Sequence, residues 1–452
     1  MCGIALILGP RAAGASEAFA CMLAALAPRG ESRETHVGPA LLAGTQRLRI
    51  VDRDAAIQPW TSPDGRWVLC YNGELFNYRE LAAQLTALGC PPGGGGDTAV
   101  LAAAFAQWGE QAISRLRGEF AFAMADTAAQ RVYLARDPIG VKPLYWARRD
   151  GALHVASEIK ALVPLGQRVH EVPPGHHGWA TAAAGPELSG YADLAEQEPV
   201  TDPAQAAKLV RAAFEDSVRV RVDTDLTVGV ILSGGLDSSL TLLHVAQMHP
   251  DCVAFTIGAP GSDDLRYARR LCVDLGVAHR VLELTPRRIG LAEIRAAIEM
   301  SELTEYGDII NAVVSVPLFR GVADAGVKVV LTGDGSDELF GGYPMYHRAS
   351  PCQARRLFLH KLTNLARTEL QRVDRVSMGH GVEARVPFLD PALVQLAMAL
   401  PMALKVRDGQ EKWILREAFA DLLPRYIRER PKNPMSHSSG LHERARLYKP
   451  LF

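Results

Sequence analysis

Short apolar runs, several of them alternating with polar residues, mark the first part of the chain as rich in β-strands. We predict strands at 4–8, 67–72, 120–126 and 131–136. Apolar residues at helical spacing predict helices between the strands, at 17–26, 78–88 and 98–109. Strands joined by turns, with helices interleaved, indicate a layered α+β domain.

The second half changes to a pattern of buried strand, glycine turn and helix. A helix is predicted at 204–219, followed by apolar strands at 226–232, 253–257 and 327–331 and by a helix at 240–248 after the first strand. Strands that alternate with helices indicate an α/β domain with a parallel, doubly wound sheet. From residue 353 onward the pattern is mostly helical.

A stretch rich in Pro, Gly, Ala and His lies between the two patterns, from about 166 to 203. A chain of 452 residues is long enough for two or three ordinary domains. We therefore predict a first domain at 1–185, a linker at 186–203 and a second domain at 204–452.

Composition narrows the class of protein. The formal net charge of −1 creates no field that would attract nucleic acid or an anionic membrane, and no apolar run is long enough to span a bilayer. Seven cysteines without a C-x-x-C pair argue against a disulfide framework or a structural zinc site. We expect a cytoplasmic protein with no nucleic-acid partner and no membrane partner.

Cys2 directly follows the initiator methionine. Removal of Met1 would leave a thiol and a free α-amine on one residue, and an α-amine with a pKa of about 7.7–8.0 can accept a proton near neutral pH. A nucleophile and a base on the same N-terminal residue are the parts of N-terminal nucleophile chemistry. Taken alone, a single cysteine is more often a packing residue.

The run 233–239 (Ser-Gly-Gly-Leu-Asp-Ser-Ser) lies where a predicted parallel strand feeds a helix. Ligands bind at the carboxyl ends of such strands. Glycine backbone, serine hydroxyls and a helix N-terminus together predict a phosphate or pyrophosphate site. Asp237 is out of place in a pure anion site and suggests Mg²⁺ held beside the phosphates.

A second acidic turn, 333–338 (Gly-Asp-Gly-Ser-Asp-Glu), follows another buried strand. Two such turns on neighbouring strands would converge on one nucleotide and metal site. Each turn taken singly is explained equally well as a tight turn that caps a helix, because Ser and Asp are good N-caps.

These motifs give the chain a resemblance, almost from end to end, to glutamine-dependent asparagine synthetases. The first half resembles class II glutamine amidotransferases in a set of short segments: 1–4, 29–30, 47–50, 71–74, 77–78, 96–98, 135–137, 140–145 and 156–162. The second half carries the pyrophosphate loop and the segments 333–343 and 381–390. The resemblance implies an αββα N-terminal-nucleophile sandwich, then an ATP-pyrophosphatase domain with a helical tail.

For the first domain, the resemblance implies a glutamine site. Cys2 would attack the side-chain amide of glutamine and form a thioester. The side chain of Asn72 and the amide of Gly73 would form the oxyanion hole, where fixed donors stabilise developing charge. The α-carboxylate and α-ammonium of glutamine would be bound by Arg47, Glu74 and Asp97. From their positions alone, Arg47 and Asp97 are equally consistent with surface charges.

For the second domain, the resemblance implies an ATP and Mg²⁺ site. The residues that would bind ATP and its pyrophosphate are Leu232, Ser233, Gly234, Gly235, Asp237, Ser238, Ser239, Ile257 and Gly333. Asp237 and Asp337 would ligate Mg²⁺. Lys432 would neutralise the α-phosphate during adenylation, although by itself it reads as a solvated lysine. Asp334 is a further catalytic candidate, and the acceptor-site candidates are Glu338, Glu383 and Arg385.

The implied reaction joins the two domains. ATP activates a carboxylate as an acyl adenylate and releases pyrophosphate, glutamine hydrolysis releases ammonia, and ammonia attacks the adenylate to give an amide and AMP. An internal channel, the solution of this family, would deliver neutral NH₃. The partners are glutamine and a carboxylic acid, aspartate or an analogue, and the resemblance leaves room for a homodimer.

The chain departs from the family pattern at several places. Glu31 and Ser32 stand where Pro and Asp are common, Ala99 replaces an acidic residue, and the acceptor-side segment 305–314 matches poorly. The chain is also short at its C-terminal end. The acid could therefore be aspartate or another carboxylate of a specialised pathway.

Two further alternatives remain open from the sequence. An intramolecular ligase that forms a lactam or a macrolactam would not need a glutaminase, so the intact Cys2, Asn72 and Asp97 argue against it. A binding protein that keeps only the scaffold would have little reason to retain both Asp237 and Asp337, because neighbouring carboxylates are costly without a cation.

Overall fold

The computed structural model describes residues 1–10, 12–53, 56–94, 96–192, 197–285 and 289–431. Contacts divide the chain into two compact units, Met1–Asp193 and Leu194–Phe452. We call the first unit 1 and the second unit 2.

Unit 1 contains two six-stranded antiparallel sheets. The first sheet has the order β10-β8-β9-β1-β3-β2, with β1 Cys2–Leu8, β2 Ser32–Val37, β3 Leu41–Arg47, β8 Tyr145–Arg149, β9 Ala152–Ala156 and β10 His170–Glu171. The second sheet has the order β12-β11-β7-β6-β5-β4, with β4 Trp60–Thr61, β5 Trp67–Leu75, β6 Gly118–Asp126, β7 Arg131–Arg136, β11 His176–Thr181 and β12 Gly185–Gly190.

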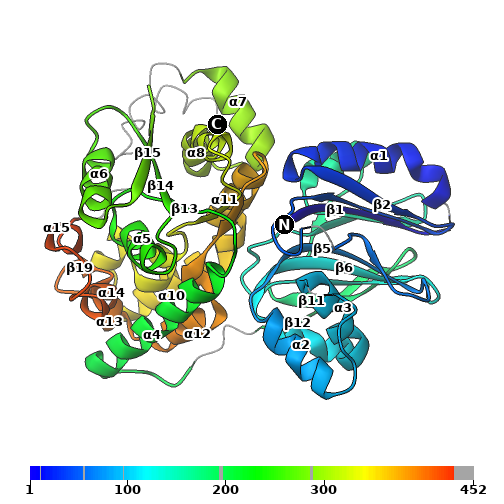
Figure 1. Cartoon of the computed structure of the whole chain (residues 1–452), viewed down its shortest axis with the longest axis horizontal. Coiled ribbons are helices and arrows are strands. Elements are labelled where there is room, and N and C mark those ends of the chain that lie inside the picture. The colour runs from blue at the N-terminus through cyan, green and yellow to red at the C-terminus, as the bar shows by residue number, and fades with distance from the viewer. Residues whose placement is uncertain (11, 54–55, 95, 193–196, 286–288, 432–452) are drawn as a thin grey trace. The chain divides into compact units, whose positions relative to one another are not determined.

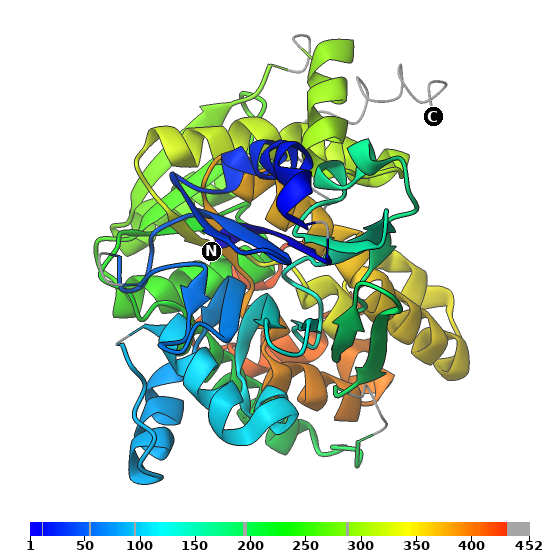
Figure 2. The same cartoon turned by 90° about the vertical axis from the view of Figure 1, so that its right-hand side faces the viewer.

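Helices cover the outer faces of the two stacked sheets. Helix α1, Ser16–Ala25, packs on the first sheet, whereas α2, Tyr78–Ala87, and α3, Asp97–Trp108, pack on the second (Figures 1 and 2). The resulting order, helix, sheet, sheet, helix, confirms the predicted αββα sandwich.

The alternation of β1 side chains explains why this strand is apolar throughout. Ile4, Leu6 and Leu8 pack between the two sheets, while Ala5 and Ile7 face α1. Successive residues of a strand point to opposite faces, so a strand covered on both sides must be apolar at every position. This burial fixes the start of the chain in the centre of unit 1.

The segment between the two predicted domains contains more structure than its composition suggested. Strands β11 and β12 pair with each other, and β11 pairs with β7. The division between the units therefore falls after Asp193, and the predicted linker, 186–203, includes most of β12. Gly, Pro and Ala in edge strands obscure the alternation that predicts a strand.

Unit 2 is built on a five-stranded parallel sheet with the order β15-β14-β13-β16-β17. The strands are β13 Val228–Ile231, β14 Val253–Gly258, β15 Ala278–Glu283, β16 Val329–Leu331 and β17 Glu383–Arg385. The chain runs outward from β13 through β14 to β15, then returns to the other side of β13 at β16. Ligands bind at such a switch point, outside the carboxyl ends of the strands.

Helices cover both faces of this sheet, as doubly wound sheets require (Figure 1). One face carries α5, Leu236–Met248, and α6, Asp263–Leu275. The other carries α8, Tyr306–Asp324, and α11, Glu369–Met378, with α7, Leu291–Ser301, packed against α8. Helix α4, Pro203–Arg221, enters unit 2 with Pro203 in its first turn and with Asp202 capping the amide of Gln205.

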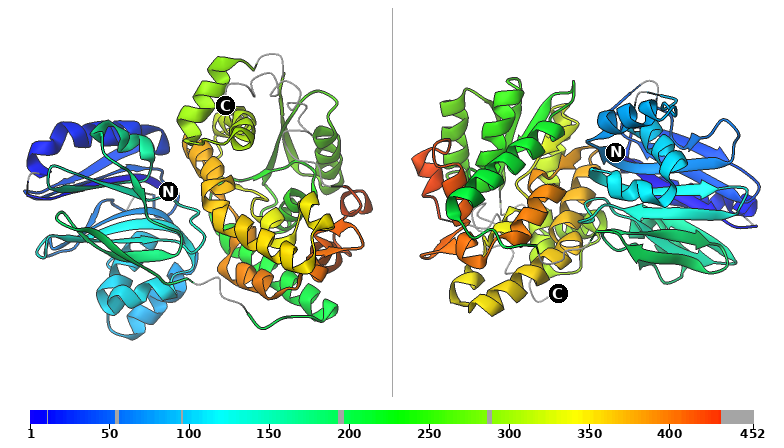
Figure 3. Two further views of the ribbon diagram at one scale, coloured as in Figure 1. Left: turned by 180° about the vertical axis from the view of Figure 1, so that it is seen from behind. Right: turned by 90° about the horizontal axis from the view of Figure 1, so that it is seen from below.

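The rest of the described chain, up to residue 431, is mostly helical, as predicted (Figure 3). Its elements are α9 Ser336–Phe340, α10 Pro351–Asn364, α12 Pro391–Ala399, α13 Met402–Lys405, β18 Val406–Arg407, β19 Gln410–Glu411, α14 Trp413–Ala418 and α15 Arg425–Arg428. Within the described part of the chain, no helix has the length and apolar character needed to cross a bilayer.

Candidate active sites

Cys2 opens β1 and is buried, with 2% of its surface exposed. Its backbone nitrogen donates a hydrogen bond to Oδ1 of Asn72 over 3.0 Å. Nε of Arg29 donates to the Cys2 carbonyl over 3.2 Å. With Met1 in place, this nitrogen is a peptide amide, so it has no basic lone pair and the thiol is the only reactive group of the residue.

The Cys2 thiol lies in an environment with opposing effects. Burial raises its pKa, whereas the N-terminal ammonium and the guanidinium of Arg47 favour the thiolate and act in the opposite direction. Cys2 and Arg47 are direct partners in the β1–β3 register. The pairing of the two strands therefore places a fixed positive charge beside the thiol.

Asn72 is fully buried in β5, the strand beneath Cys2 in the neighbouring sheet. Its Oδ1 is occupied by the Cys2 amide, but Nδ2 has no hydrogen-bond partner among the described residues. Leaving a buried donor unpaired costs about 1–3 kcal/mol. A donor held unpaired beside a nucleophile suits the stabilisation of an oxyanion, with Gly73 next in the strand.

The charged residues predicted to bind glutamine all lie buried near this point. Arg47 is 5% exposed, Glu74 6% and Asp97 7%. Asp97 begins α3, and its Oδ2 accepts hydrogen bonds from the Tyr71 hydroxyl over 2.9 Å and from the Leu75 amide over 3.2 Å. Burial raises the pKa of Asp97. None of these three residues is a solvated surface charge.

Arg29 is a supporting residue whose role sequence reasoning missed. It is 1% exposed and joins the Cys2 carbonyl to Oε1 of Glu158, which lies 2.5 Å from its Nη1. Arg29 therefore ties the first strand to the segment after β9. Its signal was present in the sequence, since residues 29–30 and 156–162 both belong to the resemblance.

In unit 2, the predicted pyrophosphate loop joins β13 to α5. Gly234 has a φ of +68°, in the left-handed region that favours glycine. The amide of Ser233 donates to the Ser238 hydroxyl over 3.2 Å, so the turn closes on the first turn of the helix. The hydroxyl of Ser239 is buried and has no partner among the described residues.

The two acidic turns converge, as the sequence predicted. Strands β13 and β16 are direct neighbours, so the turns after them lie side by side. The Ser336 hydroxyl donates to Oδ1 of Asp237 over 2.7 Å, and Ser233, Asp237, Gly333 and Asp337 line one cavity of about 290 Å³. A pair of independent helix caps would not require this contact.

A lysine absent from the sequence predictions lies between the two carboxylates. Nζ of Lys412 is 2.5 Å from Oδ2 of Asp237 and 2.6 Å from Oδ1 of Asp337. The described residues contain no group of three or more His, Cys, Asp or Glu side chains able to hold a metal. Mg²⁺ is usually held by one or two carboxylates together with substrate phosphates, so Asp237 and Asp337 fit the ion only with phosphate present.

Cations gather on the other side of the loop. Lys412, Arg416 and Arg430 line a small cavity of about 50 Å³ together with Ser233 and Gly235. Nη1 of Arg430 donates to the Ser233 carbonyl over 2.9 Å, and its Nη2 lies 2.5 Å from Asp264. This concentration of positive charge against a serine and glycine turn suits a polyphosphate.

The larger cavity is also lined by the catalytic candidate Asp334 and by one acceptor-site candidate, Glu338. Oδ1 of Asp334 accepts from Nη2 of Arg372 over 2.7 Å. Glu338 is buried and accepts a hydrogen bond from the Tyr343 hydroxyl. Burial first, and then the charges of Asp337 and Glu369, raise the pKa of Glu338 to about 8.

Helix α8 supplies the apolar and small polar wall of this cavity through Asn311, Ser315, Leu318 and Phe319. The segment 305–314, which matched the family pattern poorly, includes the start of this wall. A segment that matches the family pattern poorly thus lines part of the cavity in which we expect the acceptor to bind.

The structure places other predicted residues elsewhere. Glu383 and Arg385 pair with each other over 2.6 Å on β17, and each is 1% exposed. Neither lines a described cavity, so the assignment of these two to the acceptor site is corrected: they form a buried ion pair that also reaches the Arg221 carbonyl. A charged pair in a short strand gives no sequence signal of burial.

Two of the predicted ATP-binding residues, Leu232 and Ile257, do not line this cavity. The amide of Leu232 donates to Phe255 and its carbonyl accepts from the Thr256 hydroxyl, so strand partners already engage this backbone. Ile257 packs in the core beneath the sheet. Lys432 lies outside the described residues.

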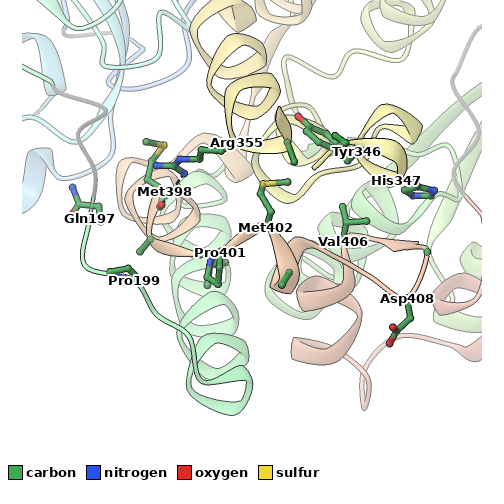
Figure 4. A pocket seen from close by; sticks show the side chains of 16 residues that line it. Gln197, Pro199, Tyr346, His347, Arg355, Met398, Pro401, Met402, Val406 and Asp408 are labelled. Atoms are coloured by element: carbon green, nitrogen blue, oxygen red, sulfur yellow. Dashed lines mark hydrogen bonds between the residues drawn. The ribbon is translucent and has the colours of Figure 1, made fainter. Parts of the chain in front are cut away.

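A separate hollow of about 700 Å³ lies in unit 2, between α10 and the α12–α13 segment (Figure 4). Met398, Met402 and Val406 give it an apolar wall. Its basic side chains are already engaged: Arg355 donates to the Met398 carbonyl over 3.3 Å, and His347 lies 3.1 Å from Glu411. None of the predicted site residues that the structure describes lines this hollow.

Comparison with known proteins agrees with this two-site arrangement. Residues 1–176 match the glutamine amidotransferase domain, and residues 209–357 and 350–451 match asparagine synthase. Asparagine synthetase B [glutamine-hydrolyzing] of Escherichia coli (strain K12) is 34% identical over 420 residues, covering 87% of this chain and 74% of that protein. Asparagine synthetase [glutamine-hydrolyzing] of Brassica oleracea is 35% identical over 419 residues, covering 87% and 70%.

Likeness to solved structures is weaker. Glutamine phosphoribosylpyrophosphate amidotransferase from B. subtilis, complexed with ADP and GMP, has a TM-score of 0.35 and 17% sequence identity, and the match covers 62% of this chain and 65% of that chain. Two family models that together match most of the chain, and relatives of 34% and 35% identity matched over 74% and 70% of their length, define the family. The chain belongs to the family of glutamine-hydrolysing asparagine synthetases.

Proposed function

We propose that the chain is a glutamine-dependent amide ligase. Cys2 hydrolyses glutamine through a thioester and releases ammonia and glutamate. In unit 2, ATP converts a carboxylate into an acyl adenylate with loss of pyrophosphate. Ammonia then attacks the acyl carbon, and the products are an amide and AMP.

The unpaired Nδ2 of Asn72 is the observation that carries this proposal. It is buried beside the Cys2 amide and has no partner in the described part of the chain. A structural asparagine at 0% exposure would satisfy both ends of its amide. An oxyanion that forms during attack on glutamine supplies the missing acceptor.

The proposal requires removal of Met1, because only then does Cys2 carry an amine that can take up a proton. Intact-mass measurement of active enzyme tests this requirement. We expect the mass of the chain that begins at Cys2, and active enzyme that keeps Met1 would contradict the role given to the amine.

In unit 2, the residues of the two turns and their neighbours hold the nucleotide. Serine hydroxyls and backbone amides of the loop contact the pyrophosphate, and Lys412, Arg416 and Arg430 neutralise it. Mg²⁺, held by Asp237 and Asp337 with the phosphates, supplies charge neutralisation for loss of pyrophosphate. Calorimetry with ATP and Mg²⁺ tests the site, and absence of binding would favour the scaffold-only alternative.

Aspartate is the first candidate acceptor, because the relatives are asparagine synthetases. Purified enzyme with ATP, Mg²⁺, glutamine and aspartate tests it through release of AMP and pyrophosphate. Release no greater than that seen without aspartate would exclude this acid.

A different carboxylic acid is the second candidate. The charges around the cavity of about 290 Å³ at the two acidic turns favour it. Arg372 is the single basic side chain among the described residues that line this cavity, and its guanidinium is already bonded to Asp334 and Glu369. A second carboxylate on the acceptor would find no free cation there. AMP release measured over dicarboxylic acids, aspartate among them, and over monocarboxylic acids with and without an amine separates the two candidates, with monocarboxylic acids expected to exceed aspartate if the second is right.

A further inference from the structure

The ion pair between Lys412 and the two aspartates joins one buried ammonium to two half-buried carboxylates of unit 2. Lys412 lies just before α14, 175 residues from Asp237 in the sequence. Its side chain is 3% exposed, against 15% for Asp237 and 20% for Asp337. The ammonium is thus more deeply buried than either carboxylate that it joins.

Two features of the backbone serve this contact. Lys412 has a φ of +55°, in the left-handed region that residues with a side chain rarely adopt. Gly342 leaves the space that the pair fills, because a Cβ on it would lie 1.8 Å from Oδ1 of Asp337 and 2.4 Å from Cε of Lys412. Strained residues of this kind persist where the surrounding structure determines them and are concentrated at functional sites.

The position of the ammonium coincides with the place that a divalent cation needs. A divalent ion held by both Asp237 and Asp337 would need the two carboxylates that Nζ of Lys412 already engages, at Oδ2 of the first and Oδ1 of the second. A lysine ammonium and a metal ion cannot share this position, because like charges at such a separation repel strongly. Binding of the metal therefore requires the lysine to leave.

We propose that Lys412 is a resident counter-ion that occupies the metal position until nucleotide arrives, so that divalent metal binds only together with ATP. This inference rests on the proposed function. Lys412 also lines the small cavity beside the loop, where a phosphate group would offer its ammonium a new anionic partner. The exchange leaves every charge paired in both states: lysine with carboxylates before binding, and metal with carboxylates and lysine with phosphate afterwards.

Binding of Mn²⁺, followed by the electron paramagnetic resonance signal of the free ion, tests the proposal without measuring turnover. Wild-type enzyme is expected to bind Mn²⁺ weakly alone and at least roughly tenfold more tightly with a non-hydrolysable ATP analogue. Lys412→Met should bind Mn²⁺ without nucleotide at least roughly tenfold more tightly than wild type, because the competing charge is gone.

Matched variants make the result specific. Lys412→Arg keeps the charge and should resemble wild type, and Lys208→Met removes an exposed lysine of α4 and should do the same. The double variant Lys412→Met with Asp337→Asn should lose the gain. Circular dichroism verifies folding of each variant, and the wild-type comparison with and without nucleotide needs no variant.

Equal Mn²⁺ affinity of wild type with and without the analogue would overturn the inference, as would a folded Lys412→Met variant with no gain. Calorimetry of the analogue on wild type separates this failure from failure of the proposed function. If the analogue binds but Mn²⁺ affinity does not depend on it, only the role of Lys412 is wrong. If the analogue does not bind, the proposed function fails as well.

Discussion

The two sites assemble their charges in different ways. In unit 1, the nucleophile and its partners come from the first 97 residues, on β1, β3 and β5 and at the start of α3, so the register of adjacent strands aligns them. In unit 2, two loops provide carboxylates, and the cations that meet them come from distant segments. Lys412 lies 175 residues from Asp237, and Arg430 lies 197 residues from Ser233.

The difference extends to how each site waits for its substrate. The glutamine site leaves a buried donor, Nδ2 of Asn72, without a partner in the described chain. The nucleotide site instead pairs its carboxylates with Lys412. Under the proposed function, the first site would receive a developing charge directly, whereas the second would exchange one ionic partner for another.

The largest effect is expected for a substitution that stops ammonia supply from the first site to the second. Cys2→Ala should lower glutamine-dependent amide formation roughly 1,000-fold or more, because the nucleophile is lost, while added ammonium salts should still support AMP release. Glutamate and AMP measured in the same samples test this, with Cys21→Ala in α1, an exposed cysteine, as the control. Unchanged glutamine-dependent product formation would contradict ammonia transfer from unit 1.

Asn72→Ala should have the next largest effect. This effect should be confined to the glutamine hydrolysis of unit 1. Loss of one oxyanion donor should lower kcat for glutamine hydrolysis roughly 100-fold, with a smaller change in KM and no change in ammonia-dependent AMP release. Asn364→Ala in α10 serves as the control. A KM effect with normal kcat would show that Asn72 binds glutamine without stabilising the oxyanion.

Arg372→Met tests the ionic assembly of unit 2. It leaves Asp334 and Glu369 without the guanidinium that bonds both, and we expect the free energy of unfolding of unit 2 to fall by about 2 kcal/mol. Hydrogen exchange measured by mass spectrometry should be faster in unit 2 of the variant and unchanged in unit 1. Arg211→Met removes ion pairs of a more exposed arginine and should cost less than about 1 kcal/mol. Equal effects of the two variants would argue against a special role for Arg372.

The sequence predicts the strands, helices and turns that carry the sites better than it predicts the contacts between distant segments. The strands at 67–72 and 131–136 and the helices flanking them were predicted from periodicity, and β5, β7, α2 and α3 confirm them. Loop motifs placed Asp237 and Asp337 together because neighbouring strands end at one edge of the sheet. Motif and periodicity are local signals, so they predict elements and turns rather than the distant segments that meet them.

Residues that act across long sequence separations were missed for a physical reason. The missed residues lie in or beside helices, and helical periodicity does not predict which distant segment a side chain will contact. These residues are Lys412, Arg372 and Arg430. The sequence argument that two aspartates need a cation was sound, but it assigned that cation to Mg²⁺ alone, and Lys412 fills the requirement in the structure. Glu383 and Arg385 show the converse, since they belong to a matching segment yet pair in the interior.

The smallest expected effect concerns pH. Burial raises the pKa of Asp97, and the Tyr71 hydroxyl acts against this by stabilising the carboxylate. Binding of the glutamine α-ammonium needs the ionised form, so KM for glutamine should rise as pH falls toward this raised pKa. Tyr71→Phe removes the stabilising bond, raises the pKa of Asp97 further and should move this rise in KM to higher pH. KM profiles from about pH 5 to 8 measure the effect, and a profile shifted toward acid would contradict it.

Transfer of nitrogen from glutamine to product tests the central claim most directly. Purified enzyme is incubated with ATP, Mg²⁺, glutamine labelled with ¹⁵N in its amide, and the acid that gives the greatest AMP release. The account predicts ¹⁵N in the amide of the product in equal amount to the AMP formed. Glutamate release without AMP, or AMP release with no ¹⁵N in the product, would contradict it.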